Sequence, residues 1–77
     1  KVQWNVQVGA FKDRANAESL LQKLRQEGYS AFLVDARAGE SVLSKVLVRA
    51  GEDRESADTL AKKLIEKGYP VLVVKLP

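Results

Sequence analysis

Few residues in this chain could do covalent chemistry, because its 77 residues include neither Cys nor His. Disulfides, thiolate zinc sites, cysteine nucleophiles and histidine general bases are therefore excluded. Asp35 and Glu40 are the candidate carboxylate pair for glycoside cleavage, but nothing in the sequence places them across a substrate. Carboxylates in a small domain are usually solvated surface groups. We therefore expect no catalytic residue, no metal site and no cofactor.

The chemistry that remains is recognition by amide and cationic side chains. In the alternating segment 4–9, Val6 and Val8 share one side, whereas Asn5 and Gln7 share the other. This period of two is typical of a strand with one buried face. Gln7 offers both a hydrogen-bond donor and an acceptor. We expect its side of the strand to form the floor of a binding surface, and Trp4 to pack at the core or its edge.

The chain repeats itself after a shift of 40 positions. The shift superposes a strand, a helix cap, an apolar helical stripe and a helix stop. Representative pairs are Val6 and Val46, Asp13 and Asp53, Leu24 and Leu64, and Gly28 and Gly68. Such a match predicts two strand–helix–strand halves, about 4–35 and 44–75, in a single domain spanning 1–77. Tyr29 and Tyr69 follow the glycines and are expected to close the helix ends.

Two such halves bury their apolar stripes by combining into one α+β domain. We expect a ferredoxin-like (RNP-like) β-α-β-β-α-β fold, with a four-stranded antiparallel sheet and two helices on one face. Residues 37–43 are expected to form a connecting loop. Alternation predicts these residues under the helices: Val6, Val8, Phe32, Val34, Val46, Val48, Leu72 and Val74. It predicts these on the other face: Asn5, Gln7, Leu33, Asp35, Lys45, Leu47, Arg49, Val73 and Lys75.

Composition fits a folded soluble domain, with 45% hydrophobic and 30% charged residues, so no disordered segment is expected. The net charge of +3 suits an anionic partner without requiring one. The longest fully apolar run, Val71 to Val74, is far too short to cross a membrane.

Several short motifs resemble those of the SPOR (sporulation-related repeat) domain family. The first half contains Val6-Gln-Val-Gly-Ala-Phe11, Ala15-Asn-Ala-Glu18 and Gly28-Tyr-Ser-Ala-Phe32. The second half contains Val46-Leu-Val48, Ser56-Ala-Asp58 and Gly68-Tyr-Pro-Val-Leu72. The resemblance covers nearly the whole chain and implies the fold expected above. It also implies non-catalytic binding of peptidoglycan, with a preference for glycan strands whose stem peptides have been removed.

The resemblance further implies positions for a glycan-binding site. Gln7 matches a polar residue of the family's first strand, Lys45 a basic residue of the third and Val73 an aliphatic residue of the last. Ala10 and Leu43 stand where the family often has Ser and an aromatic residue, so a hydroxyl and a ring are missing. With residues added from the face expected to carry no helices, the predicted glycan-binding set is Gln7, Ala10, Leu33, Leu43, Lys45, Leu47, Arg49 and Val73.

A denuded glycan suits these side chains. Each muramic unit without its peptide exposes a lactyl carboxylate, which Lys45 and Arg49 could meet through charge-assisted hydrogen bonds. Gln7 could bond acetamido or hydroxyl groups. The aliphatic members of the set could lie against the apolar faces of the sugar rings, so we expect many weak contacts and modest affinity.

Two other functions compete with glycan binding. An RNA-recognition-motif-like domain shares this topology but stacks bases on exposed aromatics of its central strands. Here those positions hold no aromatic residue, so we expect no nucleic-acid partner. A protein-docking or sensor module is the other alternative. We expect a monomeric part of a longer envelope protein, attached to the membrane only through the rest of that protein. The resemblance implies a location in the periplasm or cell envelope, at the division septum or elsewhere in the cell wall, with the septum favoured.

Overall fold

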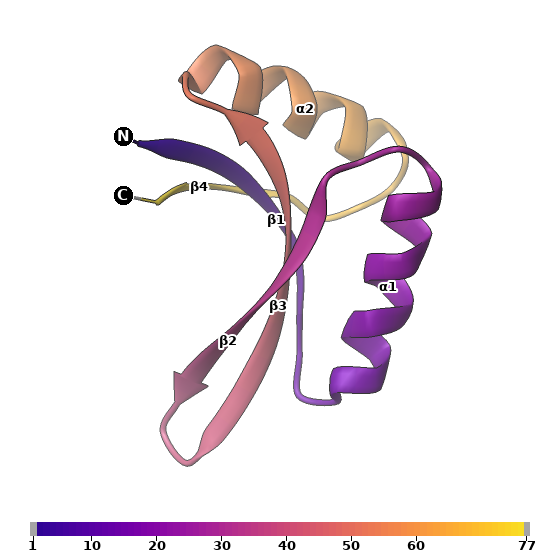
Figure 1. Cartoon of the computed structure of the whole chain (residues 1–77), viewed down its shortest axis with the longest axis vertical. Helices are drawn as coiled ribbons and strands as arrows, with labels where there is room; N and C mark the ends of the chain where they lie inside the picture. The colour runs from indigo at the N-terminus through magenta and orange to yellow at the C-terminus, as the bar shows by residue number, and fades with distance from the viewer. Residues whose placement is uncertain (1, 77) are drawn as a thin grey trace.

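The computed structural model describes residues 2–76, in which four strands and two helices follow one another in the order β-α-β-β-α-β. Their bounds are β1 Gln3–Phe11, α1 Arg14–Gln26, β2 Ala31–Ala38, β3 Ser41–Gly51, α2 Arg54–Glu66 and β4 Leu72–Leu76. The sheet has the order β2-β3-β1-β4, and every neighbouring pair is antiparallel. Both helices pack on one side of the twisted sheet (Figure 1). The predicted ferredoxin-like fold is confirmed.

Both helices begin at an aspartate that caps them. The Asp13 carboxylate accepts a hydrogen bond from the Ala15 amide at 2.9 Å, and the Asp53 carboxylate accepts one from the Ser56 amide at 2.8 Å. Each cap satisfies an amide that has no partner within its helix. Behind the caps, the buried residues of the two helices are Ala17, Leu21 and Leu24, and Ala57, Ala61 and Leu64. These are the apolar stripes that the repeat predicts.

Both helices end in the same hydrogen-bonded turn. Gly28 has φ +94 and Gly68 has φ +92, a conformation that glycine adopts without strain. The Tyr29 amide donates to the Leu24 carbonyl at 3.0 Å, and the Gly28 amide donates to the Arg25 carbonyl at the same distance. This pair of bonds defines a Schellman motif. The Tyr69 amide donates to the Leu64 carbonyl in the same way, so the predicted helix stops are confirmed.

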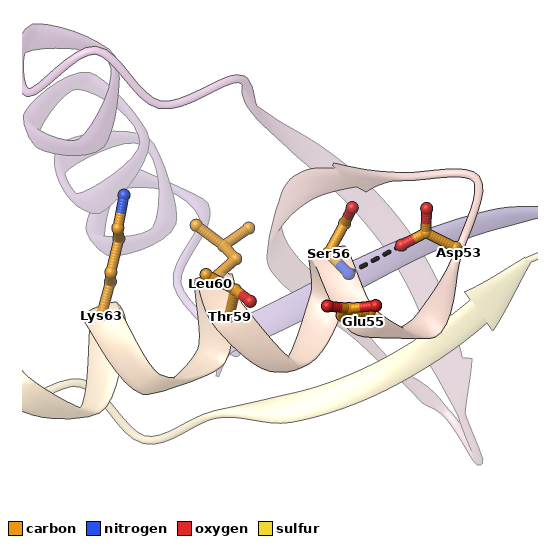
Figure 2. Close-up of a pocket in the computed structure, with 6 residues that line it drawn as sticks. All are labelled: Asp53, Glu55, Ser56, Thr59, Leu60 and Lys63. Carbon is orange, nitrogen blue, oxygen red and sulfur yellow. Dashed lines mark hydrogen bonds between the residues drawn. The ribbon is translucent and has the colours of Figure 1, made fainter.

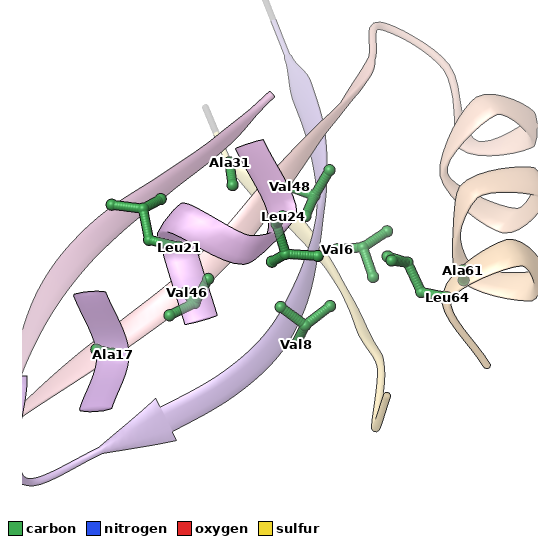
Figure 3. Close-up of a cluster of buried hydrophobic side chains, with 10 residues drawn as sticks. All are labelled: Val6, Val8, Ala17, Leu21, Leu24, Ala31, Val46, Val48, Ala61 and Leu64. Atoms are coloured by element: carbon green, nitrogen blue, oxygen red, sulfur yellow. The ribbon is translucent and has the colours of Figure 1, made fainter. Parts of the chain in front are cut away.

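The core lies between the helices and the two central strands (Figure 3). Four valines of β1 and β3 are at most 2% exposed: Val6, Val8, Val46 and Val48. Leu24 of α1 and Leu64 of α2 belong to the same cluster. Trp4 is half-buried on the helix side of β1, where the Arg54 guanidinium carbon lies 5.5 Å and the Lys75 nitrogen 5.8 Å from its ring centroid. Its predicted packing role therefore fits its position.

In the two outer strands, β2 and β4, the side chains project to the opposite sides of the sheet from those predicted. Leu33 of β2 lies opposite Val46, and Val73 of β4 lies opposite Val6, so both pack against the core. Directly opposite residues project to the same side of a sheet. The side without helices, which we name the open face, therefore carries residues predicted to be covered: Phe32, Val34, Leu72 and Val74. Asp35 and Lys75, predicted for the open face, lie on the helix side.

The segment predicted as a loop is a long hairpin instead. β2 runs to Ala38 and β3 starts at Ser41, which leaves only Gly39 and Glu40 as the turn. Gly39 has φ +64, as a two-residue hairpin turn with glycine in its first central position requires. The ladder between β1 and β3 ends at Phe11 opposite Ser44. The rest of the hairpin therefore projects beyond the sheet as an arm (Figure 1).

Candidate functional site

Strand pairing assembles a row of side chains across the middle of the open face. Phe32 of β2 lies opposite Leu47 of β3, and Leu47 lies opposite Gln7 of β1. Gln7 in turn lies opposite Leu72 of β4. The row therefore crosses all four strands, with one amide set among apolar side chains. Leu72 is 59% exposed, whereas Leu47 is only 3% exposed because its neighbours cover it.

Two cations flank this row on β3. Lys45 and Arg49 each lie two residues from Leu47 along the strand, so all three project to the open face. Lys45 lies opposite Ala10, and Arg49 lies opposite Asn5. Within residues 2–76, neither cation forms an ion pair with a carboxylate. Both charges are therefore available to an anionic ligand.

The Arg49 side chain is held by an aromatic neighbour. Its guanidinium carbon lies 5.8 Å from the centroid of the Phe32 ring, within the range of a cation–π contact. The Arg49 backbone amide also donates to the Ser30 carbonyl at 2.9 Å, which ties this end of β3 to the chain before β2. Phe32 and Arg49 thus form a preformed pair at one end of the open face.

Asn5 lies beside this pair with an unused acceptor. The residue is 2% exposed, and its Oδ1 atom has no hydrogen-bond donor among the described residues. A buried polar atom without a partner costs free energy. The open face therefore contains a buried amide oxygen next to a cation.

Six of the eight residues predicted to bind glycan lie on the open face: Gln7, Ala10, Leu43, Lys45, Leu47 and Arg49. Leu33 and Val73 do not, because they pack against the core beneath the helices. Their predicted placement on the open face was wrong. Leu43 lies opposite Ala36 on the hairpin arm, away from the central row.

Sequence reasoning missed the apolar residues that the outer strands contribute, above all Phe32 and Leu72. In β2 and β4 the apolar residues are consecutive, so alternation gives no preferred face. The pairing register does carry the signal. Phe32 lies opposite Leu47 and Leu72 lies opposite Gln7, whose own faces were predicted correctly.

A shallow hollow of about 240 Å³ opens at the end of the central row. It is lined by residues of β1 and by the segment leading into β4, including Gln7, Ala10, Pro70 and Leu72. The ladder between β1 and β4 ends at the pair Gln7 and Leu72. The hollow therefore continues the open face beyond the start of β4, with mostly apolar walls.

A larger hollow of about 380 Å³ lies on the surface of α2 (Figure 2). Asp53, in its lining, is already engaged as the helix cap, and the hydrogen bond from the Ser56 amide lowers the pKa of its carboxyl. Glu55, Thr59 and Lys63 line the rest together with Leu60. None of these residues belongs to the open face. The open face is therefore the candidate site, because cations without a carboxylate partner and exposed apolar side chains meet there.

Asp35 is engaged in hydrogen bonds within the domain and is not part of the open face. Its carboxylate accepts hydrogen bonds from Arg14 Nη1 at 2.9 Å and from Ser44 Oγ at 3.1 Å, on the helix side of the sheet.

In the described part of the chain, no group of three side chains could hold a metal ion. Neither helix there is long and apolar enough to span a membrane.

The chain matches the family model of the SPOR domain over residues 1–75. It is also similar to the solution structure of the peptidoglycan binding domain of the B. subtilis cell wall lytic enzyme CwlC, with 31% sequence identity and a TM-score of 0.79. That similarity covers 100% of this chain and 92% of the B. subtilis one. No protein of curated function matches the sequence.

Proposed function

Because the chain belongs to the SPOR domain family, we propose that it binds peptidoglycan through the open face of its sheet. The domain is a non-catalytic binding module. Its preferred ligand is a glycan strand stripped of stem peptides. Binding such strands holds a longer parent protein in the cell envelope, at the division septum or elsewhere in the cell wall.

The pairing of Lys45 and Arg49 with exposed apolar residues supports this proposal. A sugar ring has apolar C–H faces and polar edges, so it needs both kinds of surface. Phe32 and Leu72 offer apolar contact at the two ends of the central row, and Gln7 offers an amide between them. Amide groups both donate to and accept from hydroxyl and acetamido groups.

The two cations give a physical reason for preferring denuded strands. A muramic unit that carries its stem peptide has its lactyl carboxyl group locked in an amide bond and bears no charge there. Removal of the peptide restores a carboxylate, which Lys45 and Arg49 can bind by charge-assisted hydrogen bonds.

The similar B. subtilis domain is a peptidoglycan binding domain of a cell wall lytic enzyme. A non-catalytic domain of this kind supplies location, and the chemistry resides elsewhere in its parent. A nucleic-acid role of the RNA-recognition type would need exposed aromatics on β1 and β3. The open face of these two strands presents amides, cations and aliphatic residues instead, including Gln7, Lys45 and Arg49.

Co-sedimentation with purified sacculi tests the proposal. Sacculi should be used both before and after amidase digestion, with single-stranded RNA as the competing ligand. We expect more of the domain to sediment with amidase-digested sacculi than with undigested ones, and no shift of the RNA. Binding to RNA without binding to either form of sacculi would overturn the proposal.

A further inference from the structure

We infer that Phe32 holds the guanidinium of Arg49 as a carboxylate clamp, and that this clamp and Lys45 bind two successive muramic carboxylates of a glycan strand lying along β3. This inference rests on the proposed function and deepens it. It assigns a direction to the ligand and a minimum length of two muramic units. It also adds Phe32 to the site as a positioning residue.

The clamp follows from the contact between Phe32 and Arg49. Their separation of 5.8 Å engages the face of the ring, whereas the donors of a guanidinium lie in its own plane. Those donors therefore stay free to form two parallel hydrogen bonds with a carboxylate. Because the ring limits the rotamers of the arginine, less conformational entropy is lost on binding. Lysine at this position would lack the planar fork.

Asn5 adds a reason for a ligand at this end of the open face. Its buried Oδ1 has no donor within the described residues, and the residue lies opposite Arg49. Because Asn5 is 2% exposed, a ligand hydroxyl or acetamido N–H would satisfy this oxygen only if the side chain turned toward the surface on binding. The clamp is thus bordered by an acceptor that the folded chain leaves unused.

The direction of the strand follows from where the cations lie. Lys45 and Arg49 are the only cations on the open face in the described chain, and both lie on β3. Four residues of an extended strand separate them by about 13 Å. Successive muramic units are separated by one glucosamine unit, a spacing that two long cationic side chains can match. A glycan crossing the sheet at right angles to β3 would bring a carboxylate to only one of them.

Leu47 lies between the two cations but is 3% exposed, so the side chains that cover it, and not Leu47 itself, form the surface under the intervening sugar. Gln7 lies opposite Leu47 on β1 and can bond that sugar from the side. A strand along β3 therefore meets a cation, the surface beside Gln7, and a second cation in succession.

Titration calorimetry with defined glycans tests this arrangement. The probes are a peptide-free tetrasaccharide with two muramic carboxylates, the same tetrasaccharide with both carboxyl groups reduced to alcohols, and the peptide-free disaccharide. The variants are Arg49→Ala, Arg49→Lys, Lys45→Ala, Phe32→Leu and Phe32→Tyr. Lys62→Ala, which removes an exposed lysine of α2, is the matched control, and thermal unfolding of each variant verifies its fold.

We expect Arg49→Ala and Lys45→Ala each to weaken binding of the tetrasaccharide roughly tenfold, with no effect on its carboxyl-reduced form. For each of these two variants, the affinity for the tetrasaccharide should be no higher than its own affinity for the disaccharide. Phe32→Leu keeps an apolar side chain for the sugar but loses the ring, so it should weaken only carboxylate-dependent binding, whereas Phe32→Tyr keeps the ring and should bind like the unmodified domain. Arg49→Lys should recover less than half of the binding free energy that Arg49→Ala loses.

Equal binding of the free and the carboxyl-reduced tetrasaccharide by the unmodified domain would overturn the inference and leave the proposed function standing. Equal affinity for the disaccharide and the tetrasaccharide would also overturn it. If Phe32→Leu weakened both tetrasaccharides alike, Phe32 would be a general sugar contact and not a clamp. Failure to bind any of the glycans or sacculi would instead overturn the proposed function, and the inference with it.

Discussion

Gln7 and Lys45 are the residues whose replacement best separates binding from folding. Both lie half-buried on the open face, away from the core between sheet and helices. We expect Gln7→Ala and Lys45→Glu to weaken sedimentation with amidase-digested sacculi, because one loses an amide and the other repels carboxylates. Each should change the free energy of unfolding by less than about 0.5 kcal/mol.

The control for Lys45→Glu is Lys62→Glu, the same charge change on the exposed surface of α2. Equal weakening by both variants would indicate attraction by net charge alone. A large loss of stability in Gln7→Ala would place that side chain in the core and contradict the assignment of faces.

Leu24 illustrates the opposite kind of residue, which acts on folding alone. It is 0% exposed at the centre of the core cluster, so Leu24→Ala should cost about 2–5 kcal/mol of unfolding free energy. Leu72→Ala removes the same atoms from a side chain that is 59% exposed and should cost far less. Urea denaturation of the two variants measures the difference. Similar losses at the two positions would contradict the two-sided description of the sheet.

At the scale of elements, the sequence predicts central strands better than outer ones. β1 and β3 alternate apolar and polar residues, so the faces of Val6, Gln7, Val46 and Lys45 follow directly from the pattern. β2 and β4 read as short runs of consecutive apolar residues, in which either face is plausible. Only the pairing register with β3 and β1 decides to which face each side chain projects. A slip of one residue in that register moves every side chain of the strand to the other face.

The hairpin between β2 and β3 was missed for a related reason. Gly39, Glu40 and Ser41 together favour an irregular loop, but a single glycine with φ +64 suffices for a two-residue turn. The flanking residues then have partners and extend both strands. The helices, in contrast, were predictable down to their caps and stops, because those signals are local in sequence.

The ends of the two helices are joined by an ion pair that makes stability depend on pH. Lys67 Nζ lies 2.6 Å from Glu27 Oε1, and this hydrogen bond lowers the pKa of the glutamate below its ordinary value of 4.5. The carboxylate therefore stabilises the fold above pH 4.5, and the contribution is lost as the pH falls through the lowered pKa. The same bond raises the pKa of Lys67 above 10.5, so its contribution is lost only in strong alkali.

We expect Glu27→Gln to lower the unfolding temperature at pH 7 and to have progressively less effect toward pH 3. The size of the effect is small because both side chains are partly exposed to solvent. Thermal unfolding at a series of pH values measures it, with Glu66→Gln, at an exposed position of α2, as control. A difference between Glu27→Gln and the unmodified domain that stays constant with pH would contradict this role of the ion pair.

For the whole molecule, the internal repeat describes a pseudo-symmetric domain and not two independent units. β1 pairs with β3 and β4, and β2 pairs with β3, so no strand pair lies within one repeat. Each repeat therefore depends on the other for all the backbone hydrogen bonds between its strands and their neighbours. The candidate binding residues are not repeated, so they depart from this symmetry. The repeat equivalents of Lys45 and Arg49 are Asn5 and Gly9, so among residues 2–76 only β3 carries cations on the open face.

This symmetry predicts that the order of the repeats can be exchanged. Gln3 of β1 lies opposite Leu76 of β4, so the described part of the chain begins and ends on neighbouring strands (Figure 1). Joining them by a short glycine-rich turn and opening the chain between Gly39 and Glu40 gives the order β3-α2-β4-β1-α1-β2. That order is again β-α-β-β-α-β with the same neighbours in the sheet. We expect this permutant to unfold cooperatively and to bind amidase-digested sacculi.

The matched control is a permutant with the same joining turn, opened between Lys45 and Val46. This cut lies in the middle of β3, which pairs with both β1 and β2, so it should abolish the fold. Far-ultraviolet circular dichroism with thermal unfolding distinguishes the two proteins. If the permutant opened in the hairpin were as unfolded as the control, the fold would depend on the order of the chain and not on the symmetric packing of its two repeats.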